Sequence, residues 1–267
     1  MESFFDSAGV WIRYRTVGSG EPVVLVHGFT GRLEGWFDSG LAHALAERYR
    51  VIAFDCRGHG RSDKPHDPAL YGPEMGEDII RLLDHLELPR AHVIGYSMGA
   101  HILARLLVTH PERLLSATLG GAPGRLGWTD EEDEARVGVE ADELEAGRLS
   151  ALISRLEAGL SEHEITLRSR AILMGQDRLA LAASRRANRA QVVTEAELRA
   201  VRVPTLGVVG SADPYRVGFD RLKDWMPQVR IVVIAGANHA TAERHPAFRQ
   251  AVLEFLSSVP TNDEPTT

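Results

Sequence analysis

The sequence predicts an α/β protein with a mostly parallel central sheet, flanking helices and a helical insertion. Short runs rich in Val, Ile and Leu alternate with longer segments of helical periodicity, which is typical of parallel α/β sheets. The run Val23–Val26 is continuously apolar and suits a strand buried on both faces. Two short runs at the start, separated by Ala8 and Gly9, read as an antiparallel hairpin at one edge of the sheet.

The predicted elements follow one another in a regular order along the chain. We expect strands at Phe4–Asp6, Val10–Val17, Val23–Val26, Val51–Phe54, His92–Gly95, Ser116–Leu119, Thr205–Val209 and Ile231–Ile234. We expect helices at Leu41–Arg48, Glu77–Leu86, Met98–Thr109 and Pro246–Leu256. Within Glu77–Leu86 the apolar residues recur at helical spacing, which indicates a helix with one face on the sheet.

The alternation of strands and helices stops between residues 123 and 202. This stretch has helical periodicity but no convincing strand, and the segment from Thr129 to Pro214 contains no Phe, Tyr or Trp. We therefore expect residues 123–202 to form a helical cap inserted into the core. Residues 1–122 would form the first part of that α/β core, and residues 203–267 the second part.

Composition excludes several classes of protein. The 267 residues carry 30 basic and 37 acidic side chains, a formal net charge of −7 that argues against nucleic acid as the main partner. The single cysteine, Cys56, rules out an internal disulfide and a cysteine-based zinc site. No apolar stretch is long enough to span a membrane, and the N-terminal segment does not read as a signal peptide. We expect a cytoplasmic protein, and its oligomeric state stays open.

The motif Gly95-Tyr96-Ser97-Met98-Gly99 is the clearest chemical signal in the sequence. A G-x-S-x-G turn between a strand and a helix exposes its serine hydroxyl on a strained backbone at the edge of a sheet. The bland alternative is an ordinary strand-to-helix turn. The strand before the motif and the helix after it favour Ser97 as a nucleophile.

A serine nucleophile needs a base and a group that orients the base. In this architecture the acid and then the histidine should follow later in the chain, each just after a strand. Asp213 follows the strand at Thr205–Val209, and His239 follows the strand at Ile231–Ile234. Each alone could be a loop residue, but their order and placement predict a Ser97, Asp213, His239 triad.

The oxyanion that forms during acyl transfer needs two backbone N–H donors. One is expected from Met98, the residue after the nucleophile. The other is expected from Phe29, in the loop that follows Val23–Val26, where Gly28 lets the backbone turn inward. His27 in the same loop is expected to have a structural hydrogen-bonding role.

These landmarks together resemble the α/β-hydrolase fold superfamily over essentially the whole chain. The resemblance rests on His27-Gly28-Phe29, on the Ser97 motif, on Asp213 and His239, and on the segment Asp55–Ser62. Asp55–Ser62 is similar to the family's D-x-R-G-x-G-x-S loop, which is structural there. The resemblance implies that the helical insertion is a cap that sets substrate choice, and that no metal or organic cofactor is needed.

The implied activity is that of a serine carboxylesterase acting through an acyl-enzyme on a small-molecule ester with a small or medium acyl group. The absence of Phe, Tyr and Trp from Thr129 to Pro214 favours an aliphatic pocket. We expect Gly28, Trp128, Leu152 and Met174 to contribute to substrate binding, although ordinary cap packing explains the last three equally well.

Two other functions remain open. One is a cofactor-free carbon–carbon bond hydrolase or a lyase like that of the menaquinone pathway, either acting on a carboxylated substrate held by a cap arginine. Candidates in the cap include Arg136, Arg168, Arg170, Arg178, Arg185, Arg186 and Arg189. The alternative without a functional role is that these arginines form ion pairs with acidic residues on solvent-exposed helix faces. The other function is a non-catalytic ligand-binding module on the same fold.

Overall fold

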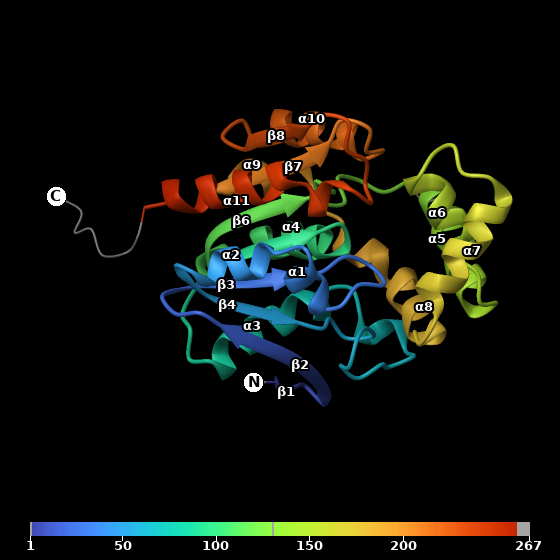
Figure 1. Ribbon diagram of the computed structural model, residues 1–267, viewed down its shortest axis with the longest axis horizontal. Coiled ribbons are helices and arrows are strands. Elements are labelled where there is room, and N and C mark those ends of the chain that lie inside the picture. The colour runs from blue at the N-terminus through green and yellow to red at the C-terminus, as the bar shows by residue number, and fades with distance from the viewer. Residues whose placement is uncertain (1, 130, 261–267) are drawn as a thin grey trace.

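An eight-stranded, mostly parallel sheet organises the protein, as the computed structural model shows for residues 2–129 and 131–260 (Figure 1). The strands lie in the order β1-β2-β4-β3-β5-β6-β7-β8. Their bounds are β1 Glu2–Ser7, β2 Val10–Val17, β3 Glu21–Val26, β4 Tyr49–Phe54, β5 Ala91–Tyr96, β6 Leu114–Gly120, β7 Thr205–Gly210 and β8 Arg230–Ile234. Strands β1 and β2 form the predicted antiparallel hairpin, and β2 also pairs antiparallel with β4, whereas the other neighbours are parallel.

Strand β3 shows why the central strands are continuously apolar. Val23, Val24, Leu25 and Val26 are all inaccessible to solvent. Val24 and Val26 belong to one hydrophobic cluster, and Val23 and Leu25 belong to a second cluster on the opposite face. Because successive side chains of a strand point to opposite faces, a sheet covered on both sides needs an apolar residue at every position.

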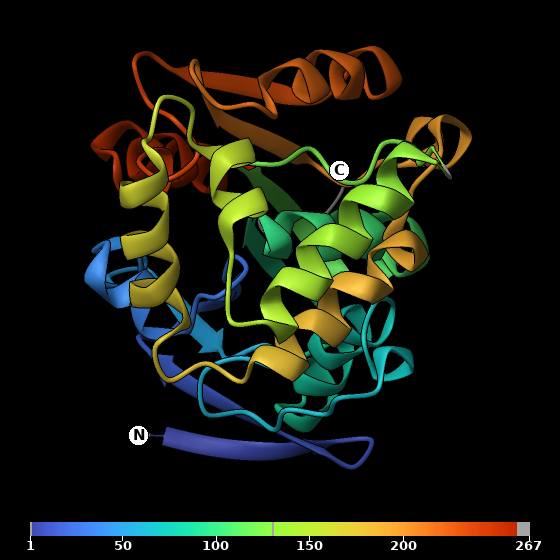
Figure 2. The same cartoon turned by 90° about the vertical axis from the view of Figure 1, so that its right-hand side faces the viewer.

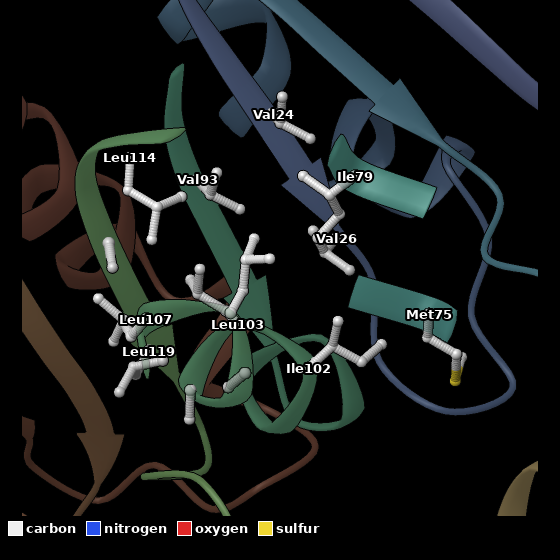
Figure 3. Packing of buried hydrophobic residues seen from close by; sticks show 14 of the residues in the cluster. Val24, Val26, Met75, Ile79, Val93, Ile102, Leu103, Leu107, Leu114 and Leu119 are labelled. Carbon is white, nitrogen blue, oxygen red and sulfur yellow. The ribbon is translucent and has the colours of Figure 1, made fainter. Parts of the chain in front are cut away.

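Helices cover both faces of this sheet. Those outside the insertion are α1 Glu34–Asp38, α2 Leu41–Ala46, α3 Glu74–His85, α4 Met98–Thr109, α10 Arg216–Trp225 and α11 Pro246–Ser258. Figure 3 shows the packing on one face, where Ile79 of α3 and Ile102 and Leu103 of α4 lie in the same cluster as strand residues Val24 and Val93. Residues of α1, α2 and α11 pack in the cluster on the other face.

The segment between β6 and β7 is helical. It contains α5 Glu132–Glu145, α6 Ser150–Leu156, α7 Glu162–Leu173, α8 Arg178–Arg186, a short 3₁₀ turn Ala187–Gln191 and α9 Glu195–Ala200. Helices α5–α8 lie together beyond one end of the sheet (Figures 1 and 2). They enclose a small hydrophobic cluster of their own, which includes Leu144, Leu152 and Leu181.

Helix α9 packs differently from the four helices before it. Its buried Leu198 belongs to the hydrophobic cluster that contains α3 and α4. The division at residues 122 and 202 stays a prediction, and Met1 and residues 261–267 lie outside the described residues.

Two helices, α1 and α10, have no counterpart among the sequence predictions. Helix α1 has only five residues, too few for a periodic pattern. Helix α10 has ten, but it buries only Phe219 and Leu222 among several charged residues. No helix among the described residues is long and apolar enough to cross a membrane.

Candidate active site

Ser97 stands at a strained turn between β5 and α4. Its backbone has φ 53° and ψ −108°, a region that residues with a side chain rarely adopt. A Cβ on Gly95 would lie 2.3 Å from the carbonyl oxygen of Gly99, and a Cβ on Gly99 would lie 2.1 Å from the carbonyl oxygen of Val26. Both motif positions therefore require glycine, and the strain fits a serine held in a fixed direction.

The side chains of Ser97, His239 and Asp213 form one hydrogen-bonded chain. His239 Nδ1 lies 2.9 Å from Asp213 Oδ2, and His239 Nε2 lies 2.8 Å from Ser97 Oγ. If the buried Asp213 carboxylate accepts the proton-bearing Nδ1, Nε2 is left free to accept from the serine hydroxyl. That is the arrangement in which histidine can act as a general base toward serine.

Further contacts fix the acid and the histidine. The backbone N–H of Tyr215 donates to Asp213 Oδ1 at 2.9 Å, so both carboxylate oxygens have a partner. The Tyr96 hydroxyl donates to the carbonyl oxygen of His239 at 2.6 Å. The rings of Tyr96 and Tyr215 lie on His239, with centroids 5.6 and 5.5 Å from that of the imidazole. The imidazole is therefore held by aromatic packing as well as by the carboxylate.

The amides predicted to hold an oxyanion, those of Met98 and Phe29, belong to two segments that adjoin Ser97. Met98 is the first residue of α4, and a helix supplies no internal acceptor for its first amides. Phe29 follows Gly28, whose ideal Cβ position lies only 3.4 Å from Ser97 Cβ, so the loop after β3 approaches the serine closely. These amides can serve an oxyanion, and that role stays a prediction.

His27 has both ring nitrogens occupied. Its Nε2 accepts the Cys56 amide at 3.0 Å, and its Nδ1 lies 2.8 Å from the carbonyl oxygen of Gly28. Burial lowers the pKa of His27, which favours the neutral ring that this pattern requires. Those contacts agree with a structural role for His27.

The Asp55–Ser62 loop is held together by its own acid. Asp55 accepts hydrogen bonds from the amides of Leu33 and Arg61, each at 2.8 Å, and from the Arg13 guanidinium at 3.1 Å. A Cβ on Gly60 would lie 2.3 Å from the Asp55 carboxyl group. The glycines of this loop therefore serve close packing around a carboxylate.

A pocket of about 380 Å³ opens beside Ser97 and His239. Gly28, Phe29 and Leu152 line it, as do Ile153, Leu156 and Ile172 of the helical insertion. The predicted aliphatic wall is thus present, and Leu152 of α6 is part of it.

Two predicted substrate-binding residues lie elsewhere, which corrects the sequence interpretation. Met174 is 82% exposed and does not line this pocket, because α7 ends at Leu173 and the chain turns outward. Trp128 lines a separate pocket beside Arg125 and Tyr215. Their apolar side chains did not predict substrate binding correctly, because an apolar residue type does not indicate which way the side chain points relative to Ser97.

Glu243 and Tyr215 are site residues that sequence reasoning missed. Glu243 lines the pocket beside Ser97, and burial raises its pKa to about 7, an effect that Arg244 and His239 oppose. Tyr215 touches both Asp213 and His239. Tyr215 lies two residues after Asp213, so its position in the sequence could have identified it as a neighbour of the predicted acid. Glu243 belongs to no motif from which a single sequence could predict its place in the site.

The candidate cap arginines differ in how far their side chains are buried. Arg185 is buried and lies 2.6 Å from Glu140, while its guanidinium stacks 4.6 Å above the Phe29 ring. Arg168 and Arg186 pair with acids at partly exposed positions. Arg185 thus contacts the loop beside Ser97 through the Phe29 ring.

The fold is that of an α/β hydrolase, and comparison with known proteins agrees. Residues 21–164 match the model of the family described as "alpha/beta hydrolase fold", which is more than half of the chain. The chain therefore belongs to that family.

Individual relatives carry several different activities. The chain is 28% identical to the 3-oxoadipate enol-lactonase 1 of Acinetobacter baylyi over 89% of its own length and 90% of the relative's. It is 29% identical to the 2-hydroxymuconate semialdehyde hydrolase of a Pseudomonas species, over 94% of this chain and 92% of that protein. The crystal structure of the enol-lactonase from Burkholderia xenovorans superposes with a TM-score of 0.79 at 25% identity, covering 96% of this chain and 100% of that one.

Identity is higher over shorter segments of other relatives. Two curated relatives are 38% and 40% identical to the chain over 120 and 121 residues. The chain spans only 30% and 32% of their lengths.

Proposed function

We propose that this protein is a serine hydrolase that cleaves a carboxylic ester of a small or medium acyl group. Ser97 attacks the carbonyl carbon, and His239 takes the hydroxyl proton and then delivers it to the leaving alkoxide. The amides of Phe29 and Met98 stabilise the oxyanion of each tetrahedral intermediate. Water then attacks the acyl-enzyme with His239 as base, which releases the acid and restores Ser97.

The observation that carries this proposal is the continuous contact from Asp213 through His239 to Ser97 at the wall of a pocket. The backbone of Ser97 is strained, and its hydroxyl lies 2.8 Å from the imidazole of His239. Backbone strain costs free energy of folding and is typical of active sites. The largely aliphatic insertion side of that pocket suits an alkyl acyl chain. Membership of a family of hydrolases supports the same reaction class.

Turnover of p-nitrophenyl acetate and butyrate tests the proposal, with Ser97→Ala as the control. We expect hydrolysis by the parent protein and none above background by the variant. Labelling by a fluorophosphonate should place the adduct on Ser97 by mass spectrometry. Equal turnover by the two proteins, or an adduct on another residue, would exclude Ser97 as the nucleophile.

A carbon–carbon bond hydrolase or a lyase that acts on a carboxylated substrate is the second candidate. The buried Arg185 beside Phe29 favours it, as does the similarity to a semialdehyde hydrolase. A panel of anionic diketones beside the neutral esters separates the two candidates, because this one predicts poor ester turnover. The helical insertion would act as the cap in either reaction, and the predicted cytoplasmic location awaits fractionation.

A further inference from the structure

A second pocket, of about 290 Å³, lies between the helical insertion and the loop after β6. It is formed by Pro123–Trp128, by α5 and α6 of the insertion, and by Tyr215 and α10. Among the described residues it shares no lining residue with the pocket beside Ser97. It is therefore distinct from the pocket into which Ser97 opens.

Guanidinium groups dominate the wall of this second pocket. Arg125, Arg136, Arg155 and Arg221 line it, and the buried Arg185 shares Glu140 with Arg155. The carboxylates that face them in the described structure are Asp133, which pairs with Arg136, and Glu140. Positive charge therefore exceeds negative charge around the pocket.

Among the described residues that line this pocket, Arg125 is the arginine whose side chain has neither a hydrogen bond nor an ion pair. Its Nε is buried without a hydrogen bond, and in residues 2–129 and 131–260 no carboxylate lies within 4.0 Å of its guanidinium. Burial and the neighbouring arginines together lower the pKa of Arg125 to about 9, an effect that Tyr215 opposes. The side chain still carries its charge at neutral pH.

Arg125 is half-buried, and arginines of the described residues that are fully buried are matched by acids. Arg13 contacts the carboxylates of Asp55, Glu2 and Glu34. Arg57 forms a two-point pair with Asp78. Since an uncompensated charge in such surroundings is expensive, an unpaired Arg125 in a roomy pocket indicates a missing anionic partner.

Tyr215 separates the second pocket from the predicted triad and contacts both. Tyr215 lines the pocket, and the Tyr215 ring contacts both His101 in the pocket and His239 of the triad, at centroid distances of 5.6 and 5.5 Å. Arg155 donates to the Tyr215 hydroxyl at 3.1 Å. A ligand held by these arginines would thus contact side chains that position the proposed base.

We propose that the Arg125 pocket binds an anionic oxygen group, a carboxylate or a phosphate, through the guanidinium of Arg125 together with Arg155. A planar guanidinium matches the paired oxygens of such groups and can bind them at two points. The group belongs either to an acidic substrate whose carbonyl reaches Ser97 or to a separate small anion. The site itself does not depend on the ester chemistry proposed above.

Thermal unfolding with succinate and with inorganic phosphate tests the site, against sodium chloride at matched ionic strength. A ligand that binds only the folded state raises Tm as its concentration passes Kd, by about 3–5 °C at ten times Kd. We expect this shift for the parent and for Arg170→Gln, which removes an equal charge from an exposed position on α7. We expect it to be lost in Arg125→Gln and reduced in Arg125→Lys.

Two results would overturn the proposal. One is a parent protein whose Tm responds to neither anion beyond chloride, or whose response survives unchanged in Arg125→Gln. The other is an Arg125→Gln variant less stable than the parent in anion-free buffer, because the guanidinium would then be satisfied without a ligand.

A second measurement identifies the source of the anion. The kcat/KM of mono-p-nitrophenyl adipate is compared with that of p-nitrophenyl hexanoate, a neutral ester with an equal number of acyl carbons. A fall of about 10-fold in this ratio, seen in Arg125→Gln and absent in Arg170→Gln, assigns the anion to the substrate. An unchanged ratio together with a lost Tm response assigns a separate anion. If neither ester is hydrolysed, the proposed function fails, while the Tm titration still decides the site.

Discussion

At the scale of single residues, the hydrogen bonds of Asp213 and His239 hold the carboxylate in one orientation and favour one tautomer of the imidazole. The Asp213 carboxylate has one oxygen on His239 Nδ1 and the other on the Tyr215 amide. Replacing it by an amide would keep the shape but would turn the imidazole to the wrong tautomer.

Asp213→Asn should therefore lower kcat for a p-nitrophenyl ester by about 10⁴-fold. The buried position is retained, so the Tm should change little. Steady-state kinetics beside thermal unfolding check this. A variant with more than a tenth of parental kcat would contradict the role given to Asp213.

Glu243 offers a second residue-scale prediction, because burial raises the pKa of its carboxyl group to about 7 from an ordinary value of 4.5. Folding therefore favours the protonated form, and its contribution to stability is present below pH 4.5 and is lost as the pH rises toward 7. Glu243→Gln mimics that neutral form. It should raise Tm relative to the parent at pH 8 and leave it nearly unchanged at pH 4.5.

The control for this measurement is Glu112→Gln, at an exposed position of the 3₁₀ turn before β6. The Tm difference between Glu112→Gln and the parent should not follow the same pH course. If Glu243→Gln gives a constant Tm difference from pH 4.5 to 8, the buried carboxyl group does not titrate in that window.

At the scale of elements, the strand-to-helix turn between β5 and α4 tolerates no added atom. A Cβ on Gly99 would meet the Val26 carbonyl oxygen of β3 at 2.1 Å, and backbone cannot move aside cheaply. Helix α5 gives the opposite case, since a Cβ on Gly138 meets nothing within 4 Å. One residue type therefore has different roles in the two helices.

Gly99→Ala should destabilise the protein by on the order of 3 kcal/mol or more and abolish turnover, because α4 and Ser97 must shift. Gly138→Ala should stabilise it by about 0.5–1 kcal/mol, because alanine lowers the entropy of the unfolded chain and favours helix. Urea unfolding of both variants checks the pair. Equal effects would mean that the contact at Gly99 does not limit the approach of α4 to β3.

At the scale of the whole molecule, the sequence predicted the sheet and the partners of Ser97 well, because both follow from local patterns. Every predicted strand overlaps an observed one. The central strands could be found because a strand buried on both faces must be continuously apolar. Asp213 and His239 could be found because each directly follows a strand. Helix α10, Glu243 and the direction of Met174 could not, because they depend on how distant segments pack.

The predicted cap and core also differ in how many apolar side chains hold them. The cluster within α5–α8 is small, whereas each face of the sheet has a larger one. Contacts between the insertion and the core include Phe29 beside Arg185, the Gln176 side chain on the Thr30 carbonyl oxygen, and Ala183 of α8 in the cluster of α3 and α4. We infer that helices α5–α8 open at a lower free-energy cost than the sheet.

Hydrogen exchange measures this difference directly. Under conditions where exchange reports opening equilibria, amides of α5–α8 should exchange faster than those of β3 and β5, whose protection should approach the global stability. A fluorophosphonate adduct on Ser97 should slow exchange in α6, because Leu152 and Ile153 line the pocket it would fill. Equal protection of α5–α8 and the central strands would show that the insertion and the sheet unfold as one unit. In that case the α5–α8 group could not open by itself to admit a substrate.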